Sequence, residues 1–204
     1  YDIFSGLGAV WGQQYGLEVA NYFAQGDEPT FETPSFRRSD AFSAVAREVT
    51  AVRTSVGINE VQNFGKYLVT GPNARAWLDR IMAGRIPKTG RMSLTPMLSE
   101  NGKLIGDFTV SCLGDETYQL TASYGAQAYH MRWFTQHLSG DAKVEVEVKN
   151  ISDSRNGFQI AGPNAAKLLQ ACTRADVSDI KFMDVREMTV GMVNCLVQRV
   201  SYTG

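Results

Sequence analysis

The amino-acid sequence predicts an α+β fold in which mostly antiparallel sheets pack against helices. Three observations predict it: a hairpin signal at Asn101-Gly102, an amphipathic segment at Gln127–Leu138, and a strand-turn-helix pattern that occurs twice. Apolar residues form 44% of the 204-residue chain and charged residues 20%, which is typical of a globular protein.

Residues 1–38 show no helical or strand period and are rich in glycine and aromatic residues. We expect an extended arm whose aromatic side chains, Trp11 among them, need a surface that covers them. The chain therefore divides into this arm and a region at residues 39–204.

A helix is expected after Ser39 or Asp40, because either side chain can cap the first backbone N–H groups. Apolar residues then recur at intervals of three and four and form one stripe: Phe42, Val45, Val49, Val52, Val56. Gly57 is placed to end this helix as its C′ residue, where glycine accepts a left-handed backbone.

The strand-turn-helix pattern covers Tyr67–Ala74 and again Phe158–Ala165, with Gly-Pro-Asn-Ala at each turn. Proline suits the turn or the first helical turn, and asparagine can cap the helix through its side chain. The segment lacks the glycine spacing and the lysine of a phosphate-binding loop. We therefore interpret both copies as structural.

The hairpin between the two copies joins Thr95–Leu98 to a return strand at Leu104–Cys112. A third strand is expected at Tyr118–Ala122. The helix that follows places three apolar residues on one side: Met131, Phe134, Leu138.

Alternation of valine with charged residues predicts a half-exposed strand at Lys143–Lys149. A last hairpin is expected at Met188–Val190 and Val193–Val200, turning at Gly191.

Charge and cysteine content exclude several functions. Lys and Arg total 20 and Asp and Glu total 21, so no basic excess exists for a nucleic-acid partner. No long uncharged apolar run is present, so we expect no membrane span. The cysteines are scattered, which predicts no metal site. His130 and His137, seven residues apart, are interpreted as partly exposed helix residues.

Asp107 is the polar residue that stands out, because it interrupts the apolar strand Leu104–Val110. Alternation places Ile105, Asp107 and Thr109 on one face. If that face lines a pocket, Asp107 is a candidate functional group; if the face meets solvent, Asp107 is an ordinary surface residue.

The segment Asn101–Val110 resembles the Asn-Gly-Gly-x-x-x-Asp-[Phe/Leu/Val]-Thr-Val hairpin of the folate-binding half of dimethylglycine and sarcosine dehydrogenases, and of the glycine-cleavage T-protein. Val56–Lys66, both Gly-Pro-Asn-Ala turns and Arg199–Gly204 are similar to further parts of that half. Residues 8–23 resemble the arm that joins it to a flavin-binding half, which favours the dehydrogenase branch.

The resemblance implies a glycine-cleavage T-protein-like folate-binding fold that is incomplete here, because the chain starts at Tyr1 and stops after a strand-like run. It implies an enzyme that uses tetrahydrofolate to capture the one-carbon unit from a small N-methyl amine such as dimethylglycine or sarcosine. It also implies FAD in a flavin-binding half of the same polypeptide, and a cytoplasmic location in bacteria or a mitochondrial matrix location in eukaryotes. The isolated fragment is expected to be inactive.

By the same resemblance, Asp107 matches the essential aspartate, and Tyr202 matches the tyrosine that packs on the folate. Further lining positions are implied at Phe64, Thr109, Thr121, Ser123, Phe182, Met183. Two residues depart from the family: Leu94 stands where tyrosine is frequent, and Ser123 where asparagine is frequent. The alternatives left open are an aminomethyltransferase or other folate-dependent demethylase, and a non-catalytic scaffold.

Overall fold

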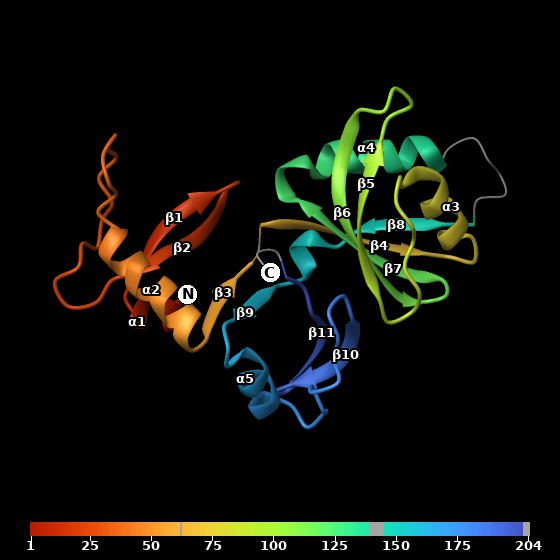
Figure 1. Ribbon diagram of the computed structural model, residues 1–204. Coiled ribbons are helices and arrows are strands. Elements are labelled where there is room, and N and C mark those ends of the chain that lie inside the picture. Colours follow the sequence, from red (N-terminus) through yellow and green to blue (C-terminus); the bar gives the residue numbers. More distant parts are fainter. Residues whose placement is uncertain (62, 139–144, 202–204) are drawn as a thin grey trace. The chain divides into compact units, whose positions relative to one another are not determined.

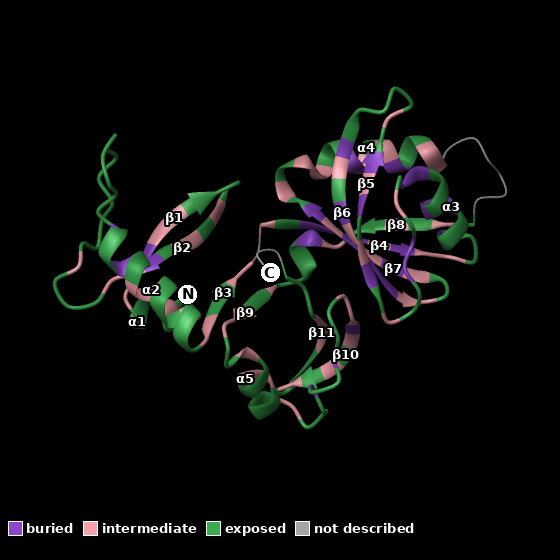
Figure 2. Cartoon of the chain, viewed as in Figure 1, coloured by how far each residue is buried: buried purple, intermediate pink, exposed green. Residues whose placement is uncertain are grey.

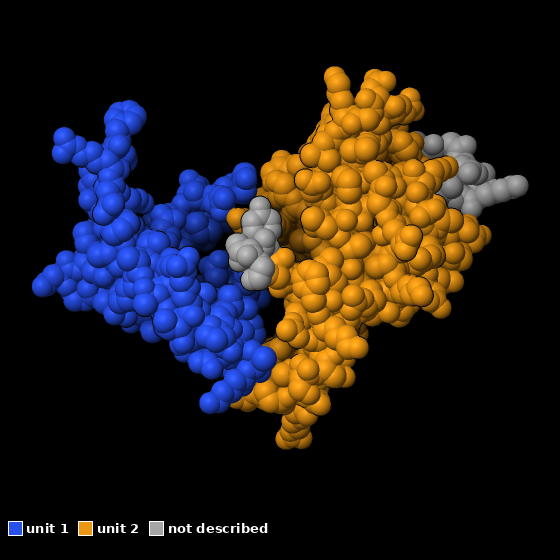
Figure 3. Space-filling model, viewed as in Figure 1, with its two compact units in different colours: residues 1–60, 158–168 blue, residues 61–157, 169–204 orange. Residues whose placement is uncertain are grey.

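The computed structural model describes residues 1–61, 63–138 and 145–201, and it confirms the α+β class. The chain forms two compact units, which we call unit 1 (residues 1–60 and 158–168) and unit 2 (residues 61–157 and 169–204) (Figures 1 and 3). Among the helices of the described ranges, none is both long and apolar enough to cross a membrane.

Unit 1 begins with α1 (Asp2–Gly6) and an antiparallel hairpin of β1 (Ala9–Gln14) and β2 (Leu17–Phe23). Its turn residues Tyr15 and Gly16 both have positive φ, 54° and 82°, as a two-residue turn between twisted strands requires. The local structure thus differs from the expected extended arm, because a tight turn at Tyr15-Gly16 folds the segment back.

The aromatic side chains of this segment cover one another. Trp11 stacks on Tyr1 with ring centroids 4.7 Å apart, and Phe4 contacts Phe23 edge-on at 5.5 Å. Tyr22 is buried, and its hydroxyl donates a 2.8 Å hydrogen bond to the carbonyl of Pro29. The need for a covering surface is therefore met in part within the segment itself.

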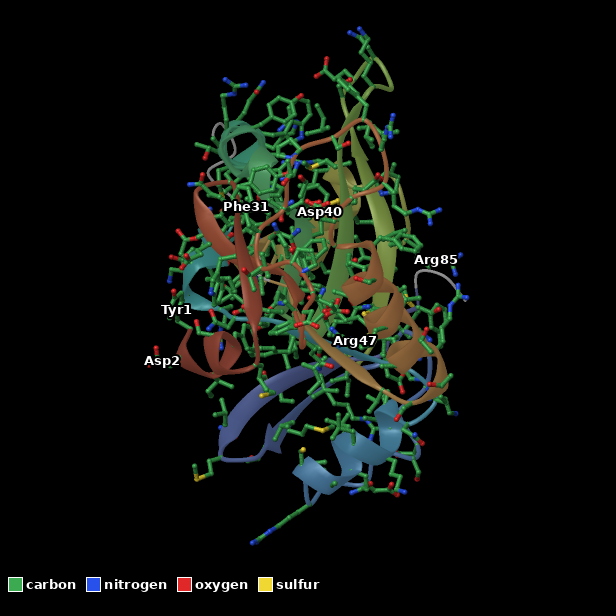
Figure 4. The ribbon with its side chains drawn as sticks, turned by 90° about the vertical axis from the view of Figure 1, so that its left-hand side faces the viewer. Tyr1, Asp2, Phe31, Asp40, Arg47 and Arg85 are labelled. Carbon is green, nitrogen blue, oxygen red and sulfur yellow. The ribbon has the colours of Figure 1, made fainter. Side chains whose placement is uncertain are left out.

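Helix α2 (Phe42–Thr54) holds the end of this hairpin through two consecutive charged residues. Glu48 accepts a hydrogen bond from the Phe23 N–H at 2.8 Å, and Arg47 donates to the Phe23 carbonyl at 2.7 Å. Arg47 also pairs with Glu28 at 2.8 Å. Figure 4 labels Arg47 on this helix and Tyr1 and Asp2 at the start of the chain.

Three details of α2 differ from the sequence expectations. Its N-cap is Ala41, without a side-chain cap, although the Ser39 hydroxyl accepts the Ala41 N–H at 3.1 Å. The apolar stripe is largely exposed, with Phe42 at 51% and Val49 at 45%. Gly57 does not end the helix: it starts β3 (Gly57–Glu60), which pairs with β9 (Phe158–Ala161).

The physical reason for glycine at position 57 is close packing and not a left-handed backbone. A Cβ there would lie 2.4 Å from Cγ2 of Val52, so the chain can leave the helix and turn into β3 only without a side chain. Sequence spacing alone cannot separate this use of glycine from a C′ residue.

Unit 2 contains a five-stranded antiparallel sheet, ordered β5-β6-β7-β4-β8 among the described residues. The strands are β4 (Phe64–Thr70), β5 (Met92–Leu98), β6 (Leu104–Gly114), β7 (Thr117–Ser123) and β8 (Glu147–Asn150). The hairpin predicted at Asn101-Gly102 is confirmed, with Gly102 at φ 72°. The first two residues of the strand predicted at Lys143–Lys149 lie outside the described residues.

Helices α3 (Ala74–Ile81) and α4 (Gln127–Leu138) cover one face of this sheet (Figure 1). Phe134 of α4 lies 5.3 Å from the Tyr67 ring and 5.9 Å from the Trp77 ring. Met131 and Leu138 pack against the same core, which confirms the predicted apolar side of α4. Burial is concentrated here, as the purple residues of Figure 2 show.

Both Gly-Pro-Asn-Ala segments form the predicted strand-turn-helix units. Gly71 and Gly162 have φ of 128° and 119°, and the chain continues into α3 and into α5 (Ala165–Cys172). The expected side-chain cap is absent at Asn73, although its carbonyl accepts the Trp77 N–H at 2.9 Å.

The last hairpin, β10 (Val185–Val190) and β11 (Val193–Gln198), turns at Gly191 as predicted. Backbone hydrogen bonds tie it to β5: the N–H of Met92 donates to the carbonyl of Met183 at 2.9 Å. The Gln198 amide donates to the hydroxyl of Ser111 on β6 at 2.7 Å. The hairpin is thereby fixed to one end of the sheet.

Candidate functional site

The candidate residues gather on the sheet face that α3 and α4 do not cover, which we call the second face. Alternation along the strands decides its members, because Tyr67, Phe108 and Leu120 point into the core. The second face carries the intervening residues: Phe64, Lys66, Leu94, Asp107, Thr109, Thr121, Ser123.

One row of this face crosses four strands. Leu94 pairs with Thr109, Thr109 with Thr121, and Thr121 with Lys66. Side chains directly opposite each other on neighbouring strands have Cβ atoms about 5 Å apart. The two threonine side chains are therefore neighbours, with the exposed Leu94 next to Thr109.

Asp107 lies in the next row. It pairs with Pro96 of β5, and it is exposed. On the same face, Phe64 of β4, 41% exposed, pairs with Ser123 of β7. The structure thus places five of the predicted site residues on one surface: Phe64, Asp107, Thr109, Thr121, Ser123.

A β-bulge corrects one sequence expectation. Ile105 was expected on the face of Asp107, but Met97 pairs with Gly106 and Leu98 with Leu104, so Ile105 is an extra residue in β6. Its side chain turns into the core and is 8% exposed. Simple alternation failed because an inserted residue moves each preceding residue of the strand to the opposite face of the sheet.

Phe182 and Met183 lie just before β10, where the backbone of Met183 joins the β5 edge of the sheet. Met183 has φ 65°, an uncommon conformation for a residue with a side chain, and its carbonyl accepts the Met92 N–H. Met92 precedes Pro96, the partner of Asp107, by four residues, which is about 13 Å along a strand. Met183 is therefore attached to β5 well away from Asp107. Tyr202 lies outside the described residues.

Lys66 is a member of the second face that sequence reasoning did not single out. It is 7% exposed, and its Nζ donates a 3.0 Å hydrogen bond to the carbonyl of Phe64. Burial lowers the pKa of Lys66, and the carboxylate of Asp153 partly opposes this. The alternation with Phe64 and Leu68 was the signal that could have found it.

The expectation that His130 is partly exposed is wrong, because its side chain is buried and the residue is only 1% exposed. It lies four residues before Phe134, on the apolar side of α4, and this spacing was a readable signal of burial. Its Nδ1 is 3.0 Å from the Tyr67 hydroxyl. Burial lowers the pKa of His130, opposed by the Ile105 backbone.

Two cavities in the described parts of the chain are lined by other residues. One, of about 440 Å³, lies in unit 1 between the β2 end and α2, and the other, of about 200 Å³, lies beside Trp133 and His137. Neither of these two cavities includes Asp107, which is exposed on the second face.

Comparison with known proteins adds a family context. The family model described as GCVT N-terminal domain matches residues 1–204. Dimethylglycine dehydrogenase, mitochondrial, of Homo sapiens is 31% identical over 191 residues, which is 93% of this chain and 22% of that protein. Aminomethyltransferase of Bacillus cytotoxicus is 32% identical over 166 residues, 80% of this chain and 44% of that protein. The chain therefore spans less than half the length of these curated relatives.

Two solved structures share the fold. The glycine cleavage system aminomethyltransferase T from Bartonella henselae superimposes with a TM-score of 0.74 over 93% of this chain and 46% of its own, at 18% identity. The heterotetrameric sarcosine oxidase from Corynebacterium sp. U-96 gives 0.55 over 81% of this chain and 82% of the matched chain, at 19% identity. The predicted fold similarity is thus confirmed.

Proposed function

This chain belongs to the GCVT N-terminal domain family, and from that premise we propose that it forms one wall of a tetrahydrofolate site used for one-carbon transfer. The observation that carries the proposal is the position of Asp107, which shares the second face with four other predicted lining residues: Phe64, Thr109, Thr121, Ser123. A carboxylate beside neighbouring threonines and an exposed aromatic ring suits a flat, nitrogen-rich ligand.

The side chains of the second face fit such a ligand by their chemistry. Phe64 and Leu94 offer exposed apolar surface on either side of the patch. Thr109 and Thr121 each supply a hydroxyl that can donate or accept a hydrogen bond. Aromatic and apolar contacts would hold the rings, and the few polar groups would orient them.

Asp107 is proposed to act on a proton. Tetrahydrofolate, when bound, would supply the nitrogen that receives the carbon unit. The carboxylate of Asp107 would accept a hydrogen bond from that N–H group and take up its proton as the nitrogen lone pair bonds to carbon, so that the product nitrogen is neutral. This role combines positioning of the folate with general base catalysis. General base catalysis typically increases the reaction rate 10²–10⁴-fold.

For the source of the carbon unit, we propose an N-methyl amine such as dimethylglycine or sarcosine, oxidised in a flavin-binding half of the same polypeptide that would carry FAD. The longer match supports this choice: the dehydrogenase aligns with 191 residues of the chain and the aminomethyltransferase with 166. Residues 8–23, which include β1 and β2, also resemble the arm that joins the folate-binding half to the flavin-binding half in the dehydrogenases.

An aminomethyltransferase is the second candidate. The identities to the two classes of relative are nearly equal, 31% and 32%. The two candidates share the folate site and differ in the donor, so one assay distinguishes them: methylenetetrahydrofolate formed from dimethylglycine or sarcosine supports the first, and formation only from an aminomethyl group carried on a protein supports the second.

The test of the shared site uses the full-length protein. Asp107→Asn should keep tetrahydrofolate binding within a few-fold by calorimetry while slowing one-carbon transfer at least about 100-fold. Glu116→Gln, an exposed carboxylate in the turn before β7, is the matched control and should leave both unchanged. Transfer by Asp107→Asn at the rate of the control would refute the role of Asp107. Absence of folate binding by the unaltered protein would refute the site.

A further inference from the structure

Behind Asp107, on the other side of the sheet, the imidazole of His130 lies against the backbone of β6. Its ring centroid is 4.7 Å from that of Phe108, and its Nδ1 is 3.0 Å from the hydroxyl of Tyr67 on β4. The contact joins α4, β4 and β6. The imidazole thus contacts Gly106 and Phe108, the two residues that flank Asp107 in the sequence.

Gly106 is the point of closest approach. A Cβ at this position would lie 2.5 Å from Nε2 of His130 and 2.9 Å from Cε2 of Phe108. Atoms at such distances overlap, so the imidazole occupies the space that a side chain at position 106 would need. The conformation of the bulge and the position of the imidazole therefore depend on each other.

The Tyr67 hydroxyl orients the ring. Tyr67 is fully buried, and its O–H can donate to Nδ1, which leaves the proton of the neutral imidazole on Nε2. Within the described residues Nε2 makes no complete hydrogen bond, yet the Ile105 backbone raises the pKa of His130 against the lowering by burial. The imidazole is thus an electrostatic neighbour of the bulge.

We propose that His130 is a positioning residue: held by Tyr67, its imidazole supports the Ile105–Asp107 bulge from behind and so directs the Asp107 carboxylate on the second face. An apolar side chain of the same volume would fill this part of the core without the cost of burying two ring nitrogens. The presence of a histidine at this position, in place of an apolar residue, is explained if its contact with the bulge holds Asp107 in place. The catalytic consequence rests on the function proposed above for Asp107; the structural consequence does not.

The structural arm of the test is hydrogen exchange in the full-length protein. His130→Leu should speed amide exchange across residues 104–110 at least about tenfold and leave residues 117–123 of the same sheet unchanged. Leu78→Ala on α3, an equally buried core variant, should not produce this local pattern. Equal exchange at 104–110 in His130→Leu and in the Leu78 control would overturn the proposal.

The catalytic arm measures one-carbon transfer at temperatures where every variant is folded. His130→Leu should lower kcat at least about tenfold with little change in KM, and His130→Gln, which keeps a polar group, should recover part of it. Combined with Asp107→Asn, His130→Leu should cause no further loss, since both act through one carboxylate. Additive losses would overturn the proposal.

The two arms separate the possible failures. If the unaltered protein neither binds folate nor transfers carbon, the proposed function fails and the exchange experiment still decides whether His130 supports the bulge. If transfer depends on Asp107 but His130→Leu behaves like Leu78→Ala in both arms, the proposed function stands and the positioning role is refuted.

Discussion

Tyr67 and His130 share a hydrogen bond in the core of unit 2, with the tyrosine oxygen 3.0 Å from Nδ1 of the histidine. The pair links the central strands to α4, and it places a titratable ring where water does not reach. The stability of the protein and the geometry of the second face should both depend on this ring remaining neutral.

The first prediction concerns pH. Burial lowers the pKa of His130 in the folded state below its ordinary 6.5, so below that pH the unfolded chain binds a proton that the folded chain refuses. The free energy of unfolding should therefore decrease as the pH falls below 6.5, with a slope of at most about 1.4 kcal/mol per pH unit from this group. Burial raises the pKa of the contacting Tyr67, which stays neutral throughout.

Urea unfolding of the protein and of His130→Leu between pH 7.5 and 5 measures this contribution, because all other groups are common to both. The unaltered protein should lose more stability than the variant over this range. Parallel pH profiles would show that the imidazole is not the responsible group.

The second prediction concerns Gly106. Gly106→Ala should destabilise unit 2 by about 1–3 kcal/mol, the usual cost of overpacking, because the added methyl overlaps the His130 ring. Gly114→Ala on the same strand is the control: nothing lies within 4 Å of its Cβ position, and the change should stay within about 0.5 kcal/mol. Chemical denaturation of both variants gives the comparison, and similar values for the two would contradict the close contact.

The third prediction concerns Leu94, which is 72% exposed beside Thr109. If the second face binds tetrahydrofolate, Leu94→Tyr should tighten binding about tenfold by adding an aromatic contact and a hydroxyl, with little effect on stability. Leu104→Tyr, an exposed leucine at the start of β6, is the matched control. Calorimetry of both variants should show tighter binding for position 94 alone; unchanged affinity there would place the ligand elsewhere.

The fourth prediction concerns the attachment of the β10–β11 hairpin to the sheet. The 2.7 Å hydrogen bond from Gln198 reaches Ser111, whose side chain is fully buried. Gln198→Ala should cost about 1–3 kcal/mol, because it leaves a buried hydroxyl without its partner. The double variant with Ser111→Ala should cost less than the sum of the single changes, and strict additivity in this cycle would argue that the contact is not energetically coupled.

The sequence predicted those elements whose signals are local. Asn101-Gly102 favours positive φ at a tight turn, and the apolar spacing of Gln127–Leu138 marks one side of a helix, so the hairpin and α4 agree with expectation. The hairpin at residues 9–23 was missed because its turn, Tyr15-Gly16, carries only one of the usual turn residues.

The members of the candidate site could be predicted partly by resemblance and partly by alternation. Asp107, Thr109 and Thr121 lie on one face, as period two implies for neighbouring strands. Ile105 and His130 were misplaced, because a bulge and a buried polar contact are set by residues far apart in the chain. No pattern within β6 announces that a histidine 24 residues later needs the space at Gly106.

The sequence by itself determined the Asn101-Gly102 hairpin, helix α4, the two Gly-Pro-Asn-Ala turns and the family to which the chain belongs, because these depend on neighbouring residues and on sequence motifs. Only the tertiary structure decided which face Asp107 occupies, which side chains accompany it, and what supports it from behind. The reason is physical: bulges, burial and close contacts arise from packing between segments, and packing exists only after the chain has folded.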